Sequence, residues 1–333
     1  MKTTNVKSSL QLFLAALIWG VAFVAQSVGM EYVGPFTFNA VRSLIGGVVL
    51  IPCILYFDKK KKKEKTRLSG SKGGYGNDRE VCTQTGIDGT CDKNRRRAEW
   101  KVTLIGGICC GICLCIASNL QQIGITYTTV GKAGFITAMY IVLVPILGIF
   151  LKKRTGIQIW ISVAMAVAGL YLLCMTEQFT IGRGDIYVLM GALVFAFHIL
   201  TIDYFAAKTD GVKMSCVQFL VSGGISSIFM LLLEHPQMSS ILAAWMPILY
   251  AGIMSCGVAY TLQIIGQKNM DPTVSSLILS LESVVSVLAG WVLLGQKLSI
   301  KELVGCTVMF GAIILAQLPE RRKCVSEEPG QES

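Results

Sequence analysis

Glu282 is the residue of this sequence whose chemistry fits its surroundings least. It stands within the apolar segment SLESVVSVLAGWVLLG and is the only charged residue between Asp271 and Lys297. A charged side chain at the centre of a membrane-spanning helix costs roughly 2.5–3.5 kcal/mol on insertion scales, so it usually faces a cavity or a partner. Two interpretations follow: Glu282 binds a substrate ammonium group or a proton, or it accepts hydrogen bonds that lock neighbouring helices together.

Three further side chains with useful chemistry lie in apolar stretches. Arg42 fits a ligand for a substrate carboxylate, or a guanidinium that reaches the membrane surface or bridges two helices. His198 fits a proton relay or a hydrogen-bonded structural histidine. Trp19 fits a platform on which a substrate stacks or a packing residue. Each of the three is therefore a candidate substrate-binding residue with a structural alternative.

Another set of polar residues falls in two matching segments, with Asn119 and Gln121 in one and Tyr260 and Gln263 in the other. Such side chains line a polar cavity, or they join helices through hydrogen bonds worth about 1 kcal/mol each. Their expected depth near the outer membrane face favours a role in gating or packing over binding at the membrane centre.

The sequence predicts no catalytic residue, no cofactor and no metal site. A membrane-embedded enzyme would need a nucleophile with a base, or several metal ligands. There are only 2 His, and the CxxC formed by Cys110 and Cys113 has no second pair to complete a ligand set. No phosphate-binding loop of the Walker A type is present, which argues against an ATP-driven pump.

The elements that must position these residues are membrane-spanning helices. Hydrophobic residues make up 53% of the 333 residues and charged residues only 15%, which is too apolar for a water-soluble domain. Windows of about 20 residues identify the apolar stretches. We therefore predict an all-α polytopic membrane protein with ten transmembrane helices, at 9–29, 36–57, 102–125, 131–151, 157–176, 185–205, 214–233, 241–264, 272–294 and 300–318.

The net charge of +10 indicates the orientation of the chain in the membrane. When ten helices are threaded from a cytosolic N-terminus, most of the 30 Lys and Arg residues fall on the cytosolic side, as the positive-inside rule requires. This predicts a multi-pass membrane protein with both termini in the cytosol. The basic charge is thereby explained without a nucleic-acid partner.

The chain contains an internal repeat. NLQQIG at 119–124 matches TLQIIG at 261–266 at an offset of 142, which also superposes Tyr140 on Glu282. Earlier matches follow an offset of 177, so an insertion of 35 residues separates the two registers. Because five helices per repeat is an odd number, the second repeat must be inverted in the membrane. Many secondary transporters bind their substrate where two such repeats meet.

The repeat divides the chain into four parts. The first repeat comprises residues 1–57 and 102–176, the second comprises 177–318, and residues 319–333 form a cytosolic tail. The segment 58–101 is rich in Lys, Arg, Gly and Ser and poor in large aliphatic residues, so we predict a disordered cytosolic loop there. Its basic clusters are expected to attract anionic lipids.

Five segments that cover both repeats carry a family pattern: AALIWGVAFVAQ, GPFTFNAVRSLIGG, GKAGFITAMYIVLVPILGIFLKKR, GALVFAFHILTIDYFAAK and LSLESVVSVLAGWVLLGQKLSIKELVGCTVMFGAIIL. With these segments, the sequence resembles the EamA-type members of the drug/metabolite transporter superfamily. It departs from the usual family pattern at Gln296, where an acidic residue is common, and at Lys152-Lys153-Arg154, where a Lys-Glu pair is common.

The resemblance implies that helices one to four and six to nine surround a central cavity, with helices five and ten at the periphery. It also implies alternating access, and export of a small metabolite such as an amino acid. Together with the lack of an organellar signal, the resemblance favours the plasma membrane of a bacterium. We therefore expect a secondary transporter of a small polar, amino-acid-like solute. Nucleotide-sugar or drug transport, a membrane-embedded enzyme, and a receptor or scaffold are the alternatives. Proton coupling and a homodimer are compatible with this expectation.

Overall fold

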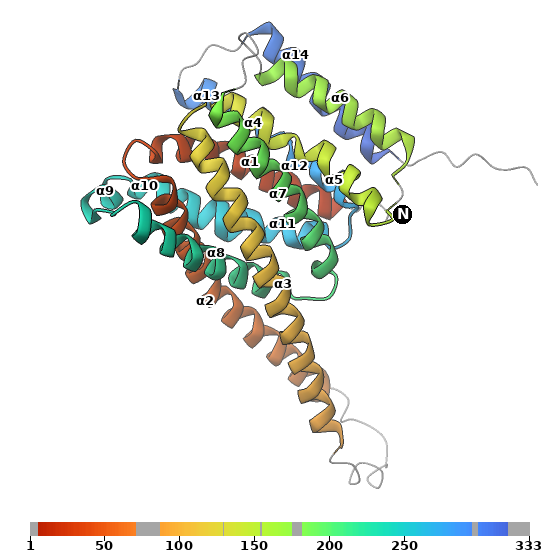
Figure 1. Cartoon of the computed structure of the whole chain (residues 1–333). Helices are drawn as coiled ribbons and strands as arrows, with labels where there is room; N and C mark the ends of the chain where they lie inside the picture. Colours follow the sequence, from red (N-terminus) through yellow and green to blue (C-terminus); the bar gives the residue numbers. More distant parts are fainter. Residues whose placement is uncertain are drawn as a thin grey trace, which may run out of the picture.

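The computed structural model describes residues 6–70, 87–128, 130–153, 155–174, 182–294 and 299–318, and these ranges are helices joined by short turns (Figure 1). The helices are α1 (Val6–Gly29), α2 (Pro35–Gly70), α3 (Ile87–Ile125), α4 (Val130–Ala138), α5 (Tyr140–Phe150), α6 (Ile157–Cys174), α7 (Arg183–Ala206), α8 (Gly211–Leu233), α9 (Met238–Ala243), α10 (Trp245–Leu249), a π-helix (Tyr250–Ala259), α11 (Tyr260–Gln267), α12 (Pro272–Leu279), α13 (Leu281–Leu294) and α14 (Ile300–Gln317).

Nine segments of these described ranges are long and apolar enough to cross a membrane, and a shorter apolar helix covers Ile157–Leu173. Each of the nine overlaps one predicted stretch, and the shorter helix falls in the predicted stretch 157–176. Many large apolar side chains on the outside of the bundle are exposed, among them Phe150, Leu231 and Val292. An apolar exterior of this kind is what contact with lipid requires.

Two predicted stretches, 131–151 and 272–294, are not continuous helices. The first divides into α4 and α5 at Met139 (φ −59°, ψ −11°) and the second into α12 and α13 at Ser280 (φ −62°, ψ −11°). The Met139 carbonyl accepts from Val142 and the Ser280 carbonyl from Ser283, so both breaks are tightened single turns. The prediction of uninterrupted helices is therefore wrong at these two places.

The predicted stretch 241–264 is also irregular. It contains the π-helix Tyr250–Ala259, which is followed directly by α11. Because π-helical turns are rare and concentrate at functional sites, this segment draws attention to the residues around Tyr260.

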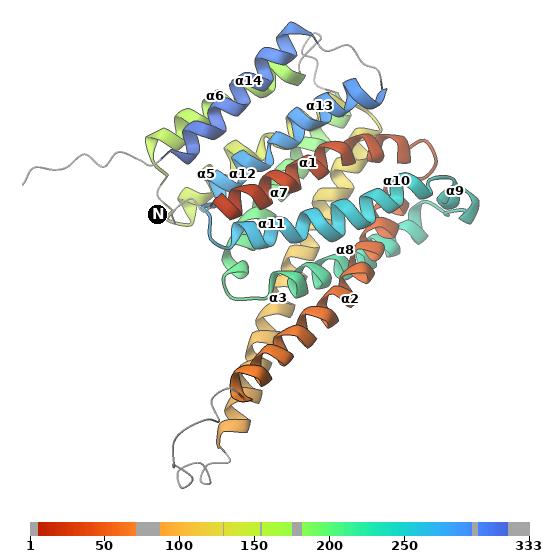
Figure 2. The ribbon, with the colours of Figure 1, turned by 180° about the vertical axis from the view of Figure 1, so that it is seen from behind.

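The predicted loop 58–101 is helical at both ends, since α2 continues to Gly70 and α3 begins at Ile87. The expectation of disorder is therefore wrong for 58–70 and 87–101. Lys, Arg and Glu are good helix formers, and they extend a helix that is already nucleated in the membrane at little cost. The two extensions project together beyond the rest of the bundle (Figure 2). The centre of the predicted loop, 71–86, lies outside the described residues.

The helices α6 and α14 pack against each other at one edge of the molecule, as both views show (Figures 1 and 2). Their contact depends on two glycines, because a Cβ atom on Gly305 would lie 2.7 Å from the Gly169 carbonyl oxygen. Elsewhere α3 packs along α7 and α8, α2 along α8, and α1 along α13. These contacts leave the centre of the bundle to the side chains described below.

The close contact of α6 and α14 predicts that alanine is tolerated much less well at Gly305 than at Gly311, although both glycines belong to α14. Gly305→Ala should lower the free energy of unfolding by roughly 1–3 kcal/mol, the usual penalty for overpacking, because the new methyl group meets backbone atoms of α6. Gly311→Ala is the control, since its Cβ atom would have its nearest neighbour, Met165 Cε, at 3.8 Å. Thermal unfolding of the detergent-purified variants measures both, and equal melting temperatures would contradict the packing.

Candidate substrate site

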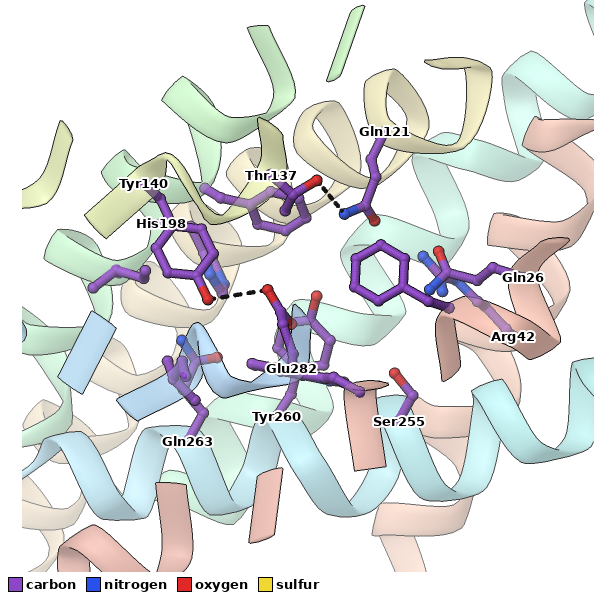
Figure 3. Close-up of a pocket in the computed structure, with 15 residues that line it drawn as sticks. Gln26, Arg42, Gln121, Thr137, Tyr140, His198, Ser255, Tyr260, Gln263 and Glu282 are labelled. Carbon is purple, nitrogen blue, oxygen red and sulfur yellow. Dashed lines mark hydrogen bonds between the residues drawn. The ribbon is translucent and has the colours of Figure 1, made fainter. Parts of the chain in front are cut away.

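A pocket in the middle of the bundle collects side chains from both predicted repeats (Figure 3). Its contributors come from α1, α2, α3, α4, α5, α7, the π-helix, α11, α12 and α13, so segments far apart in the sequence meet here. The pocket is lined by Trp19, Phe23, Gln26, Arg42, Gln121, Thr137, Tyr140, Phe195, His198, Ile199, Ser255, Tyr260, Gln263, Leu279 and Glu282.

Tyr140 and Glu282 face each other across the pocket. The Tyr140 hydroxyl donates a 3.0 Å hydrogen bond to Glu282 Oε1, and the two residues are separated by the repeat offset of 142. Both side chains are about 95% buried. Tyr140 is the first residue of α5 and Glu282 lies in the first turn of α13, so each follows one of the two helix breaks. The N-terminus of α13 carries a partial positive charge that favours a carboxylate at this position.

Tyr260 forms an aromatic cluster with two other predicted site residues. Its ring centroid lies 4.6 Å from that of Trp19 and 6.0 Å from that of His198. His198 is buried and its Nε2 lies 3.2 Å from Gln218 Oε1, within hydrogen-bond distance. His198 thus lines the pocket, as a proton relay would, and has a hydrogen-bond partner on α8, as a structural histidine would. The structure is consistent with both interpretations of this residue.

Gln121 and Gln263 line the same pocket as Glu282. Gln121 Nε2 donates a 3.0 Å hydrogen bond to Thr137 Oγ1, and Gln263 is 2% exposed. The two matching segments therefore meet in one pocket with Glu282, which favours the cavity-lining interpretation of Gln121, Tyr260 and Gln263. The pocket extends along the bundle and reaches residues one turn from the ends of α3 and α11.

Asn119 is the one predicted site residue that does not line the pocket. Its Oδ1 accepts from Asn39 Nδ2 at 3.0 Å, and its Nδ2 donates to the Cys115 carbonyl at 2.8 Å and to Ser226 Oγ at 2.9 Å. These bonds join α3 to α2 and α8. The structure therefore supports the helix-joining interpretation for this amide.

Arg42 is 5% exposed and lies inside the bundle, so it does not extend to the membrane surface. Its guanidinium carbon is 5.5 Å from the Phe38 ring centroid, a distance at which the ring face attracts a cation. In Figure 3, Arg42 and Gln26 stand at one end of the labelled side chains and Tyr140 and His198 at the other. The pocket thus holds a carboxylate and a guanidinium at separate places.

Four polar atoms of the pocket lining have no hydrogen-bond partner within the described part of the chain. They are two donors, Trp19 Nε1 and Arg42 Nε, and two acceptors, Gln26 Oε1 and Gln263 Oε1. Buried polar groups without partners are expensive, and most of them in native proteins bind water or a ligand. The pocket is therefore suited to a guest that both donates and accepts hydrogen bonds.

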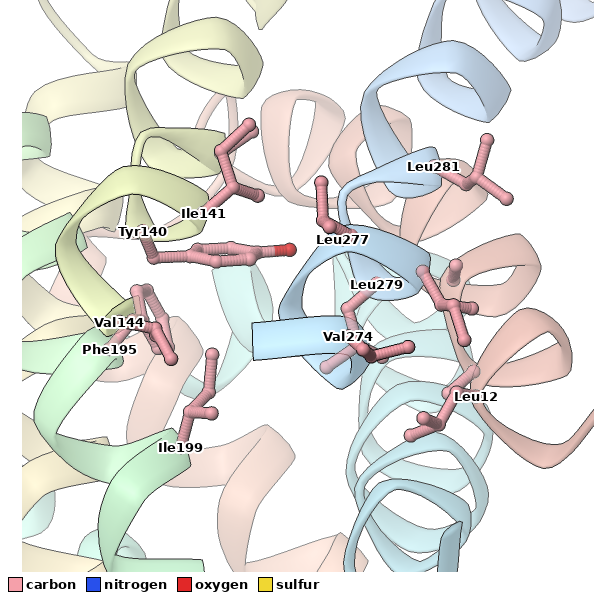
Figure 4. Close-up of a cluster of buried hydrophobic side chains, with 14 of the residues drawn as sticks. Leu12, Tyr140, Ile141, Val144, Phe195, Ile199, Val274, Leu277, Leu279 and Leu281 are labelled. Atoms are coloured by element: carbon pink, nitrogen blue, oxygen red, sulfur yellow. The ribbon is translucent and has the colours of Figure 1, made fainter. Parts of the chain in front are cut away.

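Apolar side chains of one buried cluster lie beside Tyr140 (Figure 4). Among them, Leu12, Val144, Val274 and Leu277 are each at least 93% buried. They come from α1, α5 and α12, and we call these four residues the apolar plug.

Sequence reasoning missed three polar residues of the lining: Gln26, Thr137 and Ser255. Gln26 follows Trp19 by two helical turns and therefore shares its face of α1. Thr137 precedes Tyr140 by three residues, but the break at Met139 lies between them. The helical spacing between Trp19 and Gln26 could therefore have identified Gln26 from the sequence. Ser255 lies in the π-helix, where the ordinary spacing rule does not apply.

The described residues contain no cluster of three or more His, Cys, Asp or Glu side chains that could hold a metal ion. The chemistry on offer in the pocket is instead charge recognition, hydrogen bonding and aromatic contact.

The model of the EamA-like transporter family matches residues 6–72, 88–175 and 182–318. An uncharacterized transporter of Archaeoglobus fulgidus is 25% identical over 316 residues, which are 93% of this chain and 86% of that protein. A protein known from a crystal structure is 19% identical and superposes with a TM-score of 0.70 over 94% of this chain and 96% of its own. The last likeness concerns the fold alone.

Asn119 is hydrogen-bonded to its neighbours, whereas Gln263 Oε1 has no partner in the described part of the chain. Replacing each residue by leucine should therefore change the stability of the protein in different ways. Asn119→Leu should lower the free energy of unfolding by about 1–2 kcal/mol, because it breaks bonds to two neighbouring helices. Gln263→Leu should leave the melting temperature unchanged or raise it, since it removes a buried acceptor without a partner. Thermal unfolding in detergent compares the two, and a larger loss for Gln263→Leu would reverse the assignment.

Proposed function

Because the chain belongs to the EamA-like transporter family, we propose that its central pocket is the substrate site of a secondary transporter. The protein is a multi-pass membrane transporter. The observation that carries the proposal is the pocket itself, in which Glu282, Arg42 and four unpartnered polar atoms are gathered inside an apolar bundle. Charged groups at this depth are typical of a substrate pathway.

We propose a small zwitterion, such as an amino-acid-like metabolite, as the substrate. Its ammonium group would bind Glu282 and its carboxylate would bind Arg42, so each buried charge would receive a counter-charge. A nucleotide sugar carries several negative charges, but Arg42 is the one Lys or Arg of the described pocket lining. A cationic drug would pair with Glu282 and leave Arg42 without a partner. Both alternatives therefore fit the lining less well.

The proposal includes two inverted repeats of five helices. Its support is that the breaks at Met139 and Ser280 have nearly the same backbone angles, and that they lie within one residue of the offset of 142 that relates Tyr140 to Glu282. Gly124 packs on α7 and its counterpart Gly266 packs on α1, which are the first helices of the opposite repeats. Such reciprocal contacts are typical of a pseudo-twofold axis.

We further propose export from the cytosol of a bacterial cell by alternating access, coupled to proton entry. With both termini cytosolic, the apolar plug would close the cytosolic side, and its opening would admit the substrate. Glu282 is the one carboxylate of the described lining, so a proton and a substrate ammonium group would occupy it alternately. Competition for one carboxylate makes the two movements opposite in direction.

Glu282→Gln should reduce transport about tenfold or more, the effect of losing about 1.4 kcal/mol of substrate attraction. The fold should persist, because a glutamine oxygen still accepts from Tyr140. A thermal-shift screen of amino acids first identifies the solute, and proteoliposomes then measure its uptake with and without a proton gradient. Glu302→Gln, which changes a carboxylate at the start of α14, is the control. Full activity of Glu282→Gln would exclude the assigned role.

Arg42→Met should weaken binding of the zwitterion but not of the analogue that lacks the carboxylate, because that analogue never uses the guanidinium. Affinities of the zwitterion and its decarboxylated amine for the wild type and the variant give the comparison. We expect the preference for the zwitterion to fall about tenfold, which corresponds to about 1.4 kcal/mol. An equal loss of affinity for both ligands would show that Arg42 maintains the pocket without binding the carboxylate.

A further inference from the structure

A second cavity lies away from the substrate pocket, between α2, α3 and α8. Its walls are mainly apolar and include Ile54 of α2, Leu104 of α3, and Val217 and Leu220 of α8. Asp58, Trp100 and Lys213 stand at its mouth. We call this cavity the α2–α3–α8 groove.

The groove narrows at its inner end. Gly107 of α3 packs on Val217, and Gly47 of α2 packs on Leu220, at hypothetical Cβ distances of 2.6 and 2.9 Å. These two glycines bring α3 and α2 tightly against α8. Towards the helix ends, Leu104 and Ile54 stand in place of glycine, and the cavity occupies the space between them. The groove is thus an apolar cleft that narrows where these two glycines pack and widens towards the helix ends.

Along the helix axes, the residues of the groove change from charged and aromatic to apolar. A membrane leaflet changes in the same order, from head groups to acyl chains. Its mouth coincides with the ends of three membrane spans, Pro35–Lys60, Arg97–Ile125 and Gly211–Leu233. Trp100, 47% exposed, stands at the mouth, and Trp is enriched at membrane–water interfaces. The apolar walls lie further along each span. A phospholipid whose head group lies at the mouth and whose acyl chain lies in the groove therefore places its polar and apolar parts against residues of the same kind.

The charge at the mouth favours an anionic head group. Lys213 and Asp58 form an ion pair of 2.8 Å, which leaves no net charge between them. On α3, Arg97, Glu99 and Lys101 flank Trp100, and on α2 Lys59 and Lys60 follow Asp58. All five are exposed, so the helix ends at the mouth carry an excess of positive charge. Each such charge near a membrane surface attracts anionic lipid by about 1 kcal/mol.

We propose that the α2–α3–α8 groove binds one anionic phospholipid. Its phosphate lies beside Arg97 and Lys101, and its acyl chain packs against Ile54, Leu104 and Leu220. The excess positive charge distinguishes this site from one for a zwitterionic lipid, and the narrow inner end distinguishes it from the general lipid-facing surface. The site is separate from the substrate pocket and does not depend on what the protein transports.

Filling the groove tests the acyl-chain site. The full chain is reconstituted with phosphatidylglycerol or phosphatidylcholine, exchanged into detergent, and analysed by native mass spectrometry for retained lipid. We expect one phosphatidylglycerol to remain on the wild type, at least fivefold less on Leu104→Trp, and an unchanged amount on Ile105→Trp, whose bulk points out to the exposed face. Equal retention by both variants, or a change in oligomeric mass without loss of lipid, would overturn the proposal.

Removing charge tests the head-group site. Arg97→Gln combined with Lys101→Gln should reduce the preference for phosphatidylglycerol over phosphatidylcholine about thirtyfold, as two charges near the membrane surface warrant. Lys152→Gln combined with Lys208→Gln removes the same charge from exposed residues elsewhere and should retain the preference. A wild type that holds both lipids equally, or two double variants that behave alike, would show that no anionic site exists here.

Discussion

The structure depends on the cost of holding a carboxylate and a guanidinium inside a membrane bundle. Glu282 and Arg42 are each about 95% buried, and neither can be left without compensation at that depth. For Glu282 the protein supplies the Tyr140 hydroxyl and the N-terminal end of α13. For Arg42 it supplies an aromatic face but leaves Nε without a partner in the described chain. Because the compensation is incomplete, the pocket favours a polar guest.

The irregular backbone of the bundle is concentrated where this compensation is needed. The breaks at Met139 and Ser280 present Tyr140 and Glu282 to the pocket, and the π-helix ends immediately before Tyr260. Backbone that departs from the α-helix is tolerated at membrane depth only where it lines a cavity or is covered by protein. The close glycine contact between Gly169 and Gly305 lies elsewhere, where it holds the regular helices α6 and α14 together away from the pocket. Regular, closely packed helices therefore support a site made from irregular ones.

The helical spans and most of the pocket could be predicted from the sequence, because both depend on local composition and on one repeat offset. Glu282 was evident as an isolated charge, and the offset of 142 identified Tyr140, its actual hydrogen-bond partner. Asn119 could not be separated from Gln121 in this way. Two residues apart on a helix, they face different neighbours, and only the packing of α3 decides which amide meets the pocket. The helix breaks were also hidden, because Met139 and Ser280 carry no proline or glycine signal.

The proposed transport cycle requires that substrate binding change the contact between two groups of helices, and the contacts of the bundle define such groups. Lys132 pairs with Asp185 at 2.5 Å, and Lys153 pairs with Asp203, so α4 and α5 are joined to α7 near both ends of that helix. On the other side Gly20 of α1 packs against Val285 of α13. The Tyr140–Glu282 bond connects one group to the other across the pocket. In the proposed cycle, a substrate ammonium group at Glu282 would compete with Tyr140 for the carboxylate. Binding would thereby weaken one of the links between the two groups, a second being the bond from Ser283 Oγ to the Gly134 carbonyl.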